Sequence, residues 1–290
     1  MTERNKALLA IIICVLIWGF SFISIKVAVA VIPPMTLGAM RFAIALVFLL
    51  FIKQKLAPEE RLKLRDLPLL AGAGLTGVTF YFLCENNGVA LVTVSEASIT
   101  IGVIPVITLL AERISGKVKH IALRSWVGTA LSIAGVWLVA GASGGTSGNL
   151  LGYLYMGGAA LCWVAYGFLT RPLFTRCSQI HIVFWQSVAG FLGFIPFALA
   201  ESPRWLMPTL PVMLHVGFLG IFCSAIAYWF YARSLQVLGV AISSIFINFI
   251  PVVTAIAGFF LMGDRLYPVQ WVGAALVLVG VTLTIIEKKC

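Results

Sequence analysis

The chain has 290 residues, of which 61% are apolar and only 10% are charged. Since an average soluble domain carries roughly 25% charged residues, this composition excludes most soluble proteins and indicates an integral membrane protein. Lysine and arginine together number 20, and aspartate and glutamate 10. In a soluble protein this excess would suggest a nucleic-acid partner, but in a membrane protein basic residues mark cytoplasmic loops. We therefore expect this chain to lie in a lipid bilayer and to have no nucleic-acid partner.

Long charge-free runs predict membrane-spanning helices and exclude a β-barrel, whose strands are short alternating segments. One span each is predicted over residues 7–25, 34–52, 67–84, 97–111, 177–200 and 266–286. Two more lie in 125–170, separated by a glycine-rich turn at 141–149, and one lies in each of 205–232 and 234–263. The predicted fold is an all-α integral membrane protein with ten transmembrane helices.

Basic residues separate cleanly when alternate loops are assigned to the two sides of the membrane. Sixteen of the 20 cations fall on the side of the N-terminus, and only Arg204 and Arg265 fall on the other. Lys26 and Arg41 belong to the membrane or its interface. We therefore predict a multi-pass protein of the cell membrane with both termini cytoplasmic. The first span lacks a convincing cleavage site, so we expect it to be retained.

Cysteine and histidine give no sign of a disulfide or a metal site. The six cysteines include no Cys-x-x-Cys pair, and most of them fall inside spans. His120, His181 and His215 are scattered without a ligand spacing. Neither a metal nor a cofactor is expected.

The two halves of the chain, residues 1–145 and 146–290, resemble each other. A shift of 145 residues places Trp18 on Trp163 and Lys26 on Arg171, and eight of the thirteen residues from 126 to 138 match their counterparts. Each copy holds five spans, and because five is odd the second copy must cross the membrane in the opposite sense. This predicts two inverted five-helix repeats around a central cavity.

These motifs resemble the drug/metabolite transporter superfamily, in its EamA-type ten-span branch. The resemblance covers essentially the whole chain and rests on Trp18-Gly-x-Ser-Phe22-x3-Lys26, Arg41, Glu85-Asn-Asn-Gly88, Ala97-Ser98-x6-Pro105 and the closing Trp-x-Gly-x6-Gly-Val of each half. It implies a secondary transporter of amino acids, nucleotide derivatives, drugs or other small metabolites. The chain departs from the family pattern at Ser115-Gly-Lys117, after the fourth span.

Charged residues inside spans are costly and are therefore candidates for function. Helix rise places Lys26, Arg41 and Glu85 in one outer layer, where they could form a gate or anchor a charged substrate. The alternative is a static ion pair with Lys26 reaching the headgroups. The second copy places Arg171, Gln186 and Tyr231 in an inner layer, and we predict that Glu112 contacts Arg171 there.

Aromatic and small polar residues of the apolar middle are the candidate lining of a substrate cavity, the alternative being plain packing. The predicted lining consists of Trp18, Phe22, Tyr81, Ser98, Trp163, Tyr166, Trp185, Gln186, Tyr228, Ser244 and Asn248. Trp18 and Trp163 are the favoured members, expected near the cytoplasmic and the outer half respectively. Pro105 and Pro251, in equivalent spans, are expected to bend their helices and to act either as hinges or as fixed kinks.

The preferred function is a secondary transporter, most readily an exporter, that moves small amphipathic metabolites such as amino acids by alternating access. Two other classes stay open: an intramembrane enzyme acting on a lipid-linked substrate, and a non-transporting membrane partner. The chain lacks a metalloprotease His-Glu-x-x-His motif and a phosphate-binding GxxxxGK[ST] loop. Glu85 is the candidate for proton coupling, and exchange or facilitated diffusion are the alternatives.

Overall fold

The computed structural model describes residues 2–115, 123–141, 149–247, 249–264 and 266–286, and this part of the chain is helical without strands. The first half holds α1 (Glu3–Val29), α2 (Pro34–Leu56), η1 (Leu64–Asp66), α3 (Leu67–Gly74), η2 (Leu75–Phe80), α4 (Tyr81–Leu91), α5 (Val94–Ile101), α6 (Ile104–Ile114) and α7 (Leu123–Gly141). The second half holds α8 (Leu150–Thr170), η3 (Arg171–Thr175), α9 (Gln179–Ala200), η4 (Ser202–Arg204), α10 (Leu210–Phe218), η5 (Leu219–Ile226), α11 (Ala227–Ile247), α12 (Ile250–Met262) and α13 (Pro268–Ile286).

Seven described segments are long and apolar enough to cross a membrane, and two shorter apolar helices follow them. The seven are Glu3–Val29, Pro34–Leu56, Leu64–Leu91, Val94–Ile114, Leu150–Thr175, Gln179–Ala200 and Leu210–Leu238, and the shorter two are Ile250–Met262 and Pro268–Gly280. The all-α membrane fold predicted from composition is therefore confirmed. One expected turn is absent: α11 continues as helix through Arg233, where a break between two spans was predicted.

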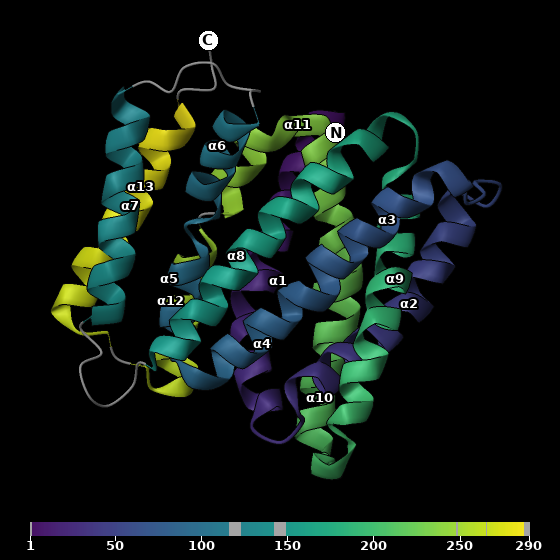
Figure 1. Ribbon diagram of the computed structural model, residues 1–290, viewed down its shortest axis with the longest axis horizontal. Helices are drawn as coiled ribbons and strands as arrows, with labels where there is room; N and C mark the ends of the chain where they lie inside the picture. Colours follow the sequence, from purple (N-terminus) through teal and green to yellow (C-terminus); the bar gives the residue numbers. More distant parts are fainter. Residues whose placement is uncertain (1, 116–122, 142–148, 248, 265, 287–290) are drawn as a thin grey trace.

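The helices form a bundle whose two ends differ (Figure 1). The start of α1 and the end of α13 lie at the same end, at the top of the view, and we call it the terminal end. Helices α7 and α13 run side by side along one flank of the bundle. Their glycines allow this approach, since a Cβ on Gly135 would collide with the Gly273 carbonyl and one on Gly280 with the Gly128 carbonyl.

The two prolines predicted to bend their helices lie at complete breaks. Helix α5 ends at Ile101 and α6 begins at Ile104, so Pro105 occupies the first turn of a new helix. Pro251 has the same place at the start of α12. Proline is tolerated there because a first-turn N–H has no partner within the helix. The prediction that each proline bends a continuous helix is therefore wrong, because each proline starts a separate helix.

Two π-helical segments, η2 and η5, interrupt equivalent spans of the two halves. A π-helix shifts the backbone hydrogen bonds and is frequent at functional sites. Here side chains reach carbonyls of both segments: the Tyr228 hydroxyl donates to Gly77 O at 3.2 Å, and the Trp18 indole donates to Cys223 O at 3.1 Å. The irregular turns therefore position two aromatic residues in the middle of the bundle.

Carboxylates from one half hold helix starts of the other half. Glu201 accepts hydrogen bonds from Thr36 N at 2.7 Å and Thr36 Oγ1 at 2.8 Å, at the start of α2. Asp264 accepts from Ser95 N at 3.3 Å, at the start of α5. Negative charge is favourable beside the exposed N–H groups of a helix start. These contacts join the halves at the end opposite the terminal end.

Candidate functional site

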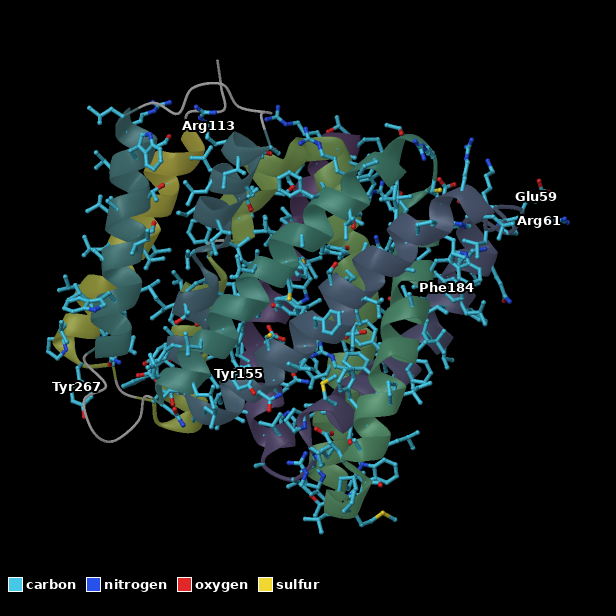
Figure 2. The ribbon with its side chains drawn as sticks, in the orientation of Figure 1. Glu59, Arg61, Arg113, Tyr155, Phe184 and Tyr267 are labelled. Carbon is cyan, nitrogen blue, oxygen red and sulfur yellow. The ribbon has the colours of Figure 1, made fainter. Side chains whose placement is uncertain are left out.

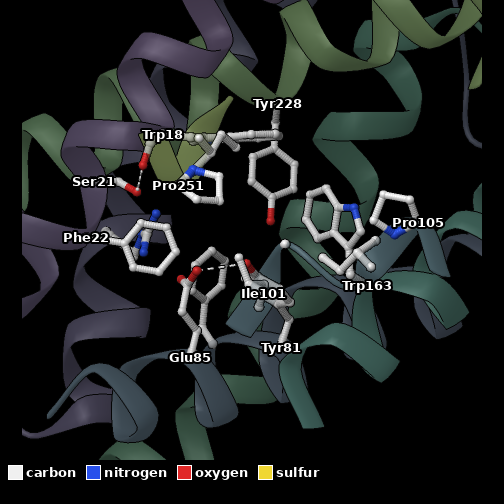
Figure 3. Close-up of a pocket in the computed structure, with 15 residues that line it drawn as sticks. Trp18, Ser21, Phe22, Tyr81, Glu85, Ile101, Pro105, Trp163, Tyr228 and Pro251 are labelled. Carbon is white, nitrogen blue, oxygen red and sulfur yellow. Dashed lines mark hydrogen bonds between the residues drawn. The ribbon is translucent and has the colours of Figure 1, made fainter. Parts of the chain in front are cut away.

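A cavity of about 50 Å³ lies where the two halves meet in the middle of the bundle. It is bordered by both broken helices, through Pro105 and Pro251, and by the spans α1, α2, α4, α8 and α11 (Figure 3). The lining is mostly apolar, with a few polar side chains among the apolar ones. The lining residues are Trp18, Ser21, Phe22, Arg41, Tyr81, Phe82, Glu85, Ile101, Gly102, Ile104, Pro105, Trp163, Tyr228, Ile250 and Pro251. Since one water needs roughly 10–15 Å³ of such space, the cavity has room for only a few waters.

Arg41 brings a buried positive charge to this cavity. Its side chain is 2% exposed, and its Nε donates to Ser224 Oγ at 2.9 Å. The guanidinium carbon lies 4.0 Å from the centre of the Phe82 ring, and Nη1 has no hydrogen-bond partner in the described chain. A ring and one hydroxyl offset only part of the cost of a buried cation. The arrangement leaves the N–H groups of Nη1 available for a group that enters the cavity.

Glu85 brings a carboxylate to the same cavity from α4. It is 3% exposed and accepts a hydrogen bond of 2.7 Å from the Tyr81 hydroxyl, one turn earlier in the helix. Figure 3 shows this pair at the edge of the cavity, facing the aromatic rings on the other side. Arg41 and Glu85 thus present opposite charges to one small space. That they lie in an outer layer of the membrane stays a prediction.

The aromatic lining is built around two tryptophans from equivalent positions of the halves. The ring centres of Trp18 and Trp163 are 5.6 Å apart, with the rings at 87° to each other. Tyr228 contacts both, at 5.7 Å from Trp18 and 5.8 Å from Trp163. The prediction that these tryptophans lie in opposite halves of the membrane is wrong, because they meet edge to face in the centre. Edge-to-face rings of this kind are mutually stabilising.

A second cavity of about 260 Å³ adjoins the first and shares Ile104 and Trp163 with it. Its lining includes Thr108, Glu112, Tyr166, Arg171 and Tyr231. Tyr166 and Tyr231, two more of the predicted residues, thus line the same cavity as the predicted ion pair of Glu112 and Arg171. Arg171 Nη1 lies 3.7 Å from Glu112 Oε1, so the predicted contact is present. Whether that pair works as a gate stays a prediction. Arg171 follows the end of α8 that reaches the terminal end of the bundle (Figure 1).

Lys26 does not join Arg41 and Glu85 at the cavity. Its Nζ donates to the carbonyls of Val89, Ala90 and Val92 at 2.8, 3.1 and 2.7 Å, at the C-terminal end of α4. A lysine at a helix C-terminus satisfies carbonyls that lack partners and opposes the helix dipole. Helix rise predicts only the depth of Lys26, whereas the direction of its side chain depends on packing.

Three further predicted residues line neither cavity. Gln186 donates to Thr170 Oγ1 at 2.9 Å, and Ser98 donates to Ser95 O at 2.9 Å. Trp185 packs with Leu70 and neighbouring apolar side chains in a separate cluster. Ser244 and Asn248 lie outside the residues whose side chains the structure describes.

Sequence reasoning missed two groups of residues. Ser224 and Phe82 hold the Arg41 guanidinium, and an isolated serine in an apolar span was the available signal for the first. At the terminal end, Glu60, Cys177 and His181 come together, with ligand atoms all within 4.8 Å of one another. The four-residue separation of Cys177 and His181 was the signal for this group.

Comparison with known proteins places the chain among membrane transporters. The model of the EamA-like transporter family matches residues 5–141 and again 150–286. An uncharacterized transporter of Archaeoglobus fulgidus is 27% identical over 98% of this chain and 100% of its own length. The inner membrane transporter YedA of Escherichia coli is 29% identical over 94% and 88%. A probable terminal-alkyne amino-acid exporter of Streptantibioticus cattleyicolor is 27% identical over 97% and 94%.

A solved structure shares the fold, with a TM-score of 0.69 at 19% identity over 99% of both chains. The two family matches together cover almost the whole chain, and the relatives named above are transporters by name. The chain is a multi-pass membrane protein that belongs to the EamA-like transporter family.

Proposed function

We propose that the chain is a secondary transporter that exports small amphipathic metabolites, amino acids among them, by alternating access. The observation that carries this proposal is the central cavity, where Arg41 and Glu85 present opposite charges among aromatic rings. A zwitterionic solute with a carboxylate, an ammonium group and an apolar side chain matches that arrangement. Arg41 Nη1 would donate to the carboxylate, since it lacks a partner in the described chain.

The proposed architecture has ten spans in two inverted repeats, residues 1–145 and 146–290. Three observations support it: the family model matches the chain twice, π-helical segments interrupt spans of both halves at corresponding places, and a proline begins a new helix in each half. Broken helices around a central site are a recurrent design in transporters built from inverted repeats.

The proposed path leads from the terminal end through the larger cavity to the central one. The larger cavity of about 260 Å³ adjoins the central cavity of about 50 Å³. Ligand pockets for small molecules usually measure roughly 300–1,000 Å³, so the central cavity must widen to hold a solute. The rings of Trp18, Trp163 and Tyr228 would have to part for this. In this proposal the terminal end faces the cytoplasm, since sixteen of 20 cations were assigned to that side.

Coupling to protons would use Glu85, the carboxylate that lines the central cavity. In this proposal Arg41 binds the carboxylate of the substrate and ionised Glu85 binds its ammonium group. Protonation would make Glu85 neutral, and Glu85 would then release the ammonium group. Exchange of one solute for another would need no titrating group. A pH gradient imposed across the proteoliposome membrane would drive accumulation of solute only if transport is coupled to protons.

Counterflow of labelled amino acids into proteoliposomes tests the proposal. The unmodified chain is expected to accumulate label from at least one amino acid with an apolar side chain. Arg41→Gln and Glu85→Gln are each expected to reduce the initial rate roughly 10- to 100-fold, because a hydrogen bond to a charged group contributes about 1.5–3 kcal/mol.

Arg204→Gln is the matched control, because Arg204 is exposed and pairs with Glu201 at 3.4 Å, away from the cavity. Its rate should equal that of the unmodified chain. Normal flux in folded Arg41→Gln and Glu85→Gln proteins would contradict the assigned site. Absence of flux for every solute would favour the two other classes, an intramembrane enzyme or a non-transporting partner.

A further inference from the structure

A cluster of metal-ligating side chains lies at the terminal end, and none of its residues lines the central cavity. Glu60 belongs to the loop after α2, Cys177 to the turn before α9, and His181 to the first turn of α9. Their ligand atoms all lie within 4.8 Å of one another. Figure 2 shows the neighbours Glu59 and Arg61 at the tip of this loop.

His181 is the observation that points to a ligand. Its side chain is 1% exposed, and Nδ1 has no hydrogen-bond partner in the described chain. The nearest carboxylate oxygen, Glu60 Oε2, is 3.9 Å away, beyond hydrogen-bond distance. A buried ring nitrogen without a partner is costly and calls for an explanation such as a bound ion. The nitrogen faces the cluster.

Glu60 is already positioned for this role by the helix start. It accepts a hydrogen bond from Ser178 N at 2.9 Å and a short one from Ser178 Oγ, so its carboxylate is held beside the first turn of α9. Asp66, 1% exposed, lies 4.0 Å from Cys177 Sγ but is paired with Arg176 at 3.3 Å. Asp66 therefore adds negative charge next to the cluster without being one of its three ligands.

We propose that Glu60, Cys177 and His181 bind a divalent transition-metal ion of the zinc class at the terminal end. One thiolate, one imidazole and one carboxylate are the ligands that Zn²⁺ accepts in proteins, with water in the fourth position. Tetrahedral ligands lie roughly 3.5 Å apart, so the ligand atoms need to approach by only about 1 Å. The ion would link the loop after α2 to the start of α9, one element from each half.

Cobalt binding to the full chain, purified in detergent and free of any histidine tag, tests this proposal. Co²⁺ replaces Zn²⁺ in such sites, and a cobalt–thiolate bond adds a charge-transfer absorption that reports Cys177 directly. One equivalent of Co²⁺ is expected to bind with this absorption. Cys177→Ser should abolish the absorption, and Glu60→Gln and His181→Gln should weaken binding at least tenfold.

Cys84→Ser and His215→Gln are the matched controls, because they remove the same residue types elsewhere, and both should bind Co²⁺ like the unmodified chain. The proposal is overturned if the unmodified chain shows no thiolate absorption, or if Cys177→Ser keeps it.

A second measurement needs no variant at all and so does not depend on how variants fold. Zn²⁺ is expected to slow alkylation of Cys177, read by peptide mass, at least tenfold, while the alkylation of Cys84 stays unchanged. Equal rates for Cys177 with Zn²⁺ and with a chelator would overturn the proposal.

Discussion

Arg41 carries a positive charge into the bundle, and the two groups that contact its guanidinium directly are neutral. One hydroxyl of Ser224 and the face of Phe82 contact the guanidinium. Arginine is suited to this position because its charge is delocalised, it stacks on rings and it is less strongly hydrated than lysine. The cost of burying it favours a functional reason for keeping it.

Lys26 gives the opposite example, because its three hydrogen bonds to main-chain carbonyls explain its position without any substrate. Lys26→Met keeps the length of the apolar stem and removes the donors. We expect this change to lower the free energy of unfolding by about 2 kcal/mol, since hydrogen bonds to a charged group contribute roughly 1.5–3 kcal/mol. Thermal unfolding in detergent measures it.

The same variant separates the structural role of Lys26 from a gate. Substrate affinity in Lys26→Met should stay within about twofold of the unmodified chain, in contrast to Arg41→Gln. A stable Lys26→Met protein that has lost transport would restore Lys26 to the gate that its position in the sequence suggested.

At the scale of elements, the breaks before Pro105 and Pro251 determine the shape of the site. Both prolines border the central cavity, and each begins a helix of its own. Irregular backbone at membrane depth is tolerated where it is buried or lines a cavity. Helices α5 and α6 are separate, and α12 packs against α5. In the proposed transport cycle they would move relative to one another without bending a continuous helix.

The contact of α7 with α13 depends on glycine. A Cβ on Gly135 would meet the backbone of Gly273 and Val277, whereas a Cβ on Gly157 of α8 would meet nothing within 4 Å. Gly135→Ala is therefore expected to destabilise the protein by about 1–3 kcal/mol through overpacking. Gly157→Ala, the matched control, should be neutral or stabilising by up to about 1 kcal/mol, because alanine favours a helix.

Thermal unfolding of the two glycine variants in the same detergent provides the comparison. Equal midpoints for Gly135→Ala and Gly157→Ala would mean that α7 and α13 do not depend on this close approach.

At the scale of the whole molecule, charge predicts which end faces the cytoplasm. Arg61 lies in the loop after α2, at the terminal end, and Met207 lies before α10 at the other end with 94% of its surface exposed. In intact cells a membrane-impermeant maleimide is expected to label Met207→Cys and to leave Arg61→Cys unlabelled until the membrane is opened. The unmodified chain, with its own cysteines, sets the background.

The reverse labelling pattern would invert the topology. Labelling of both positions in intact cells would contradict the proposed ten-span architecture, which has an odd number of spans between them.

Sequence reasoning succeeded where a property depends on composition or on neighbours along the chain. The membrane class, the positions of most spans, the pairing of Tyr81 with Glu85 one turn apart and the approach of Glu112 to Arg171 all follow from apolar runs, helix rise and loop charge. It failed where direction matters, as with Lys26, and where a helix ends within an apolar run, as at Gly102 before Pro105.

The sequence by itself determined that this chain lives in a bilayer, because 61% apolar and 10% charged residues cannot cover a water-soluble surface. It also predicted the repeat, since matching tryptophans and glycines recur at a constant shift. Only the tertiary structure decided that Trp18 meets Trp163, that Arg41 and Glu85 share a cavity, and that Glu60 lies beside Cys177 and His181. These contacts join residues from different helices, and their distances depend on how the helices pack and where their backbones break, which no local pattern records.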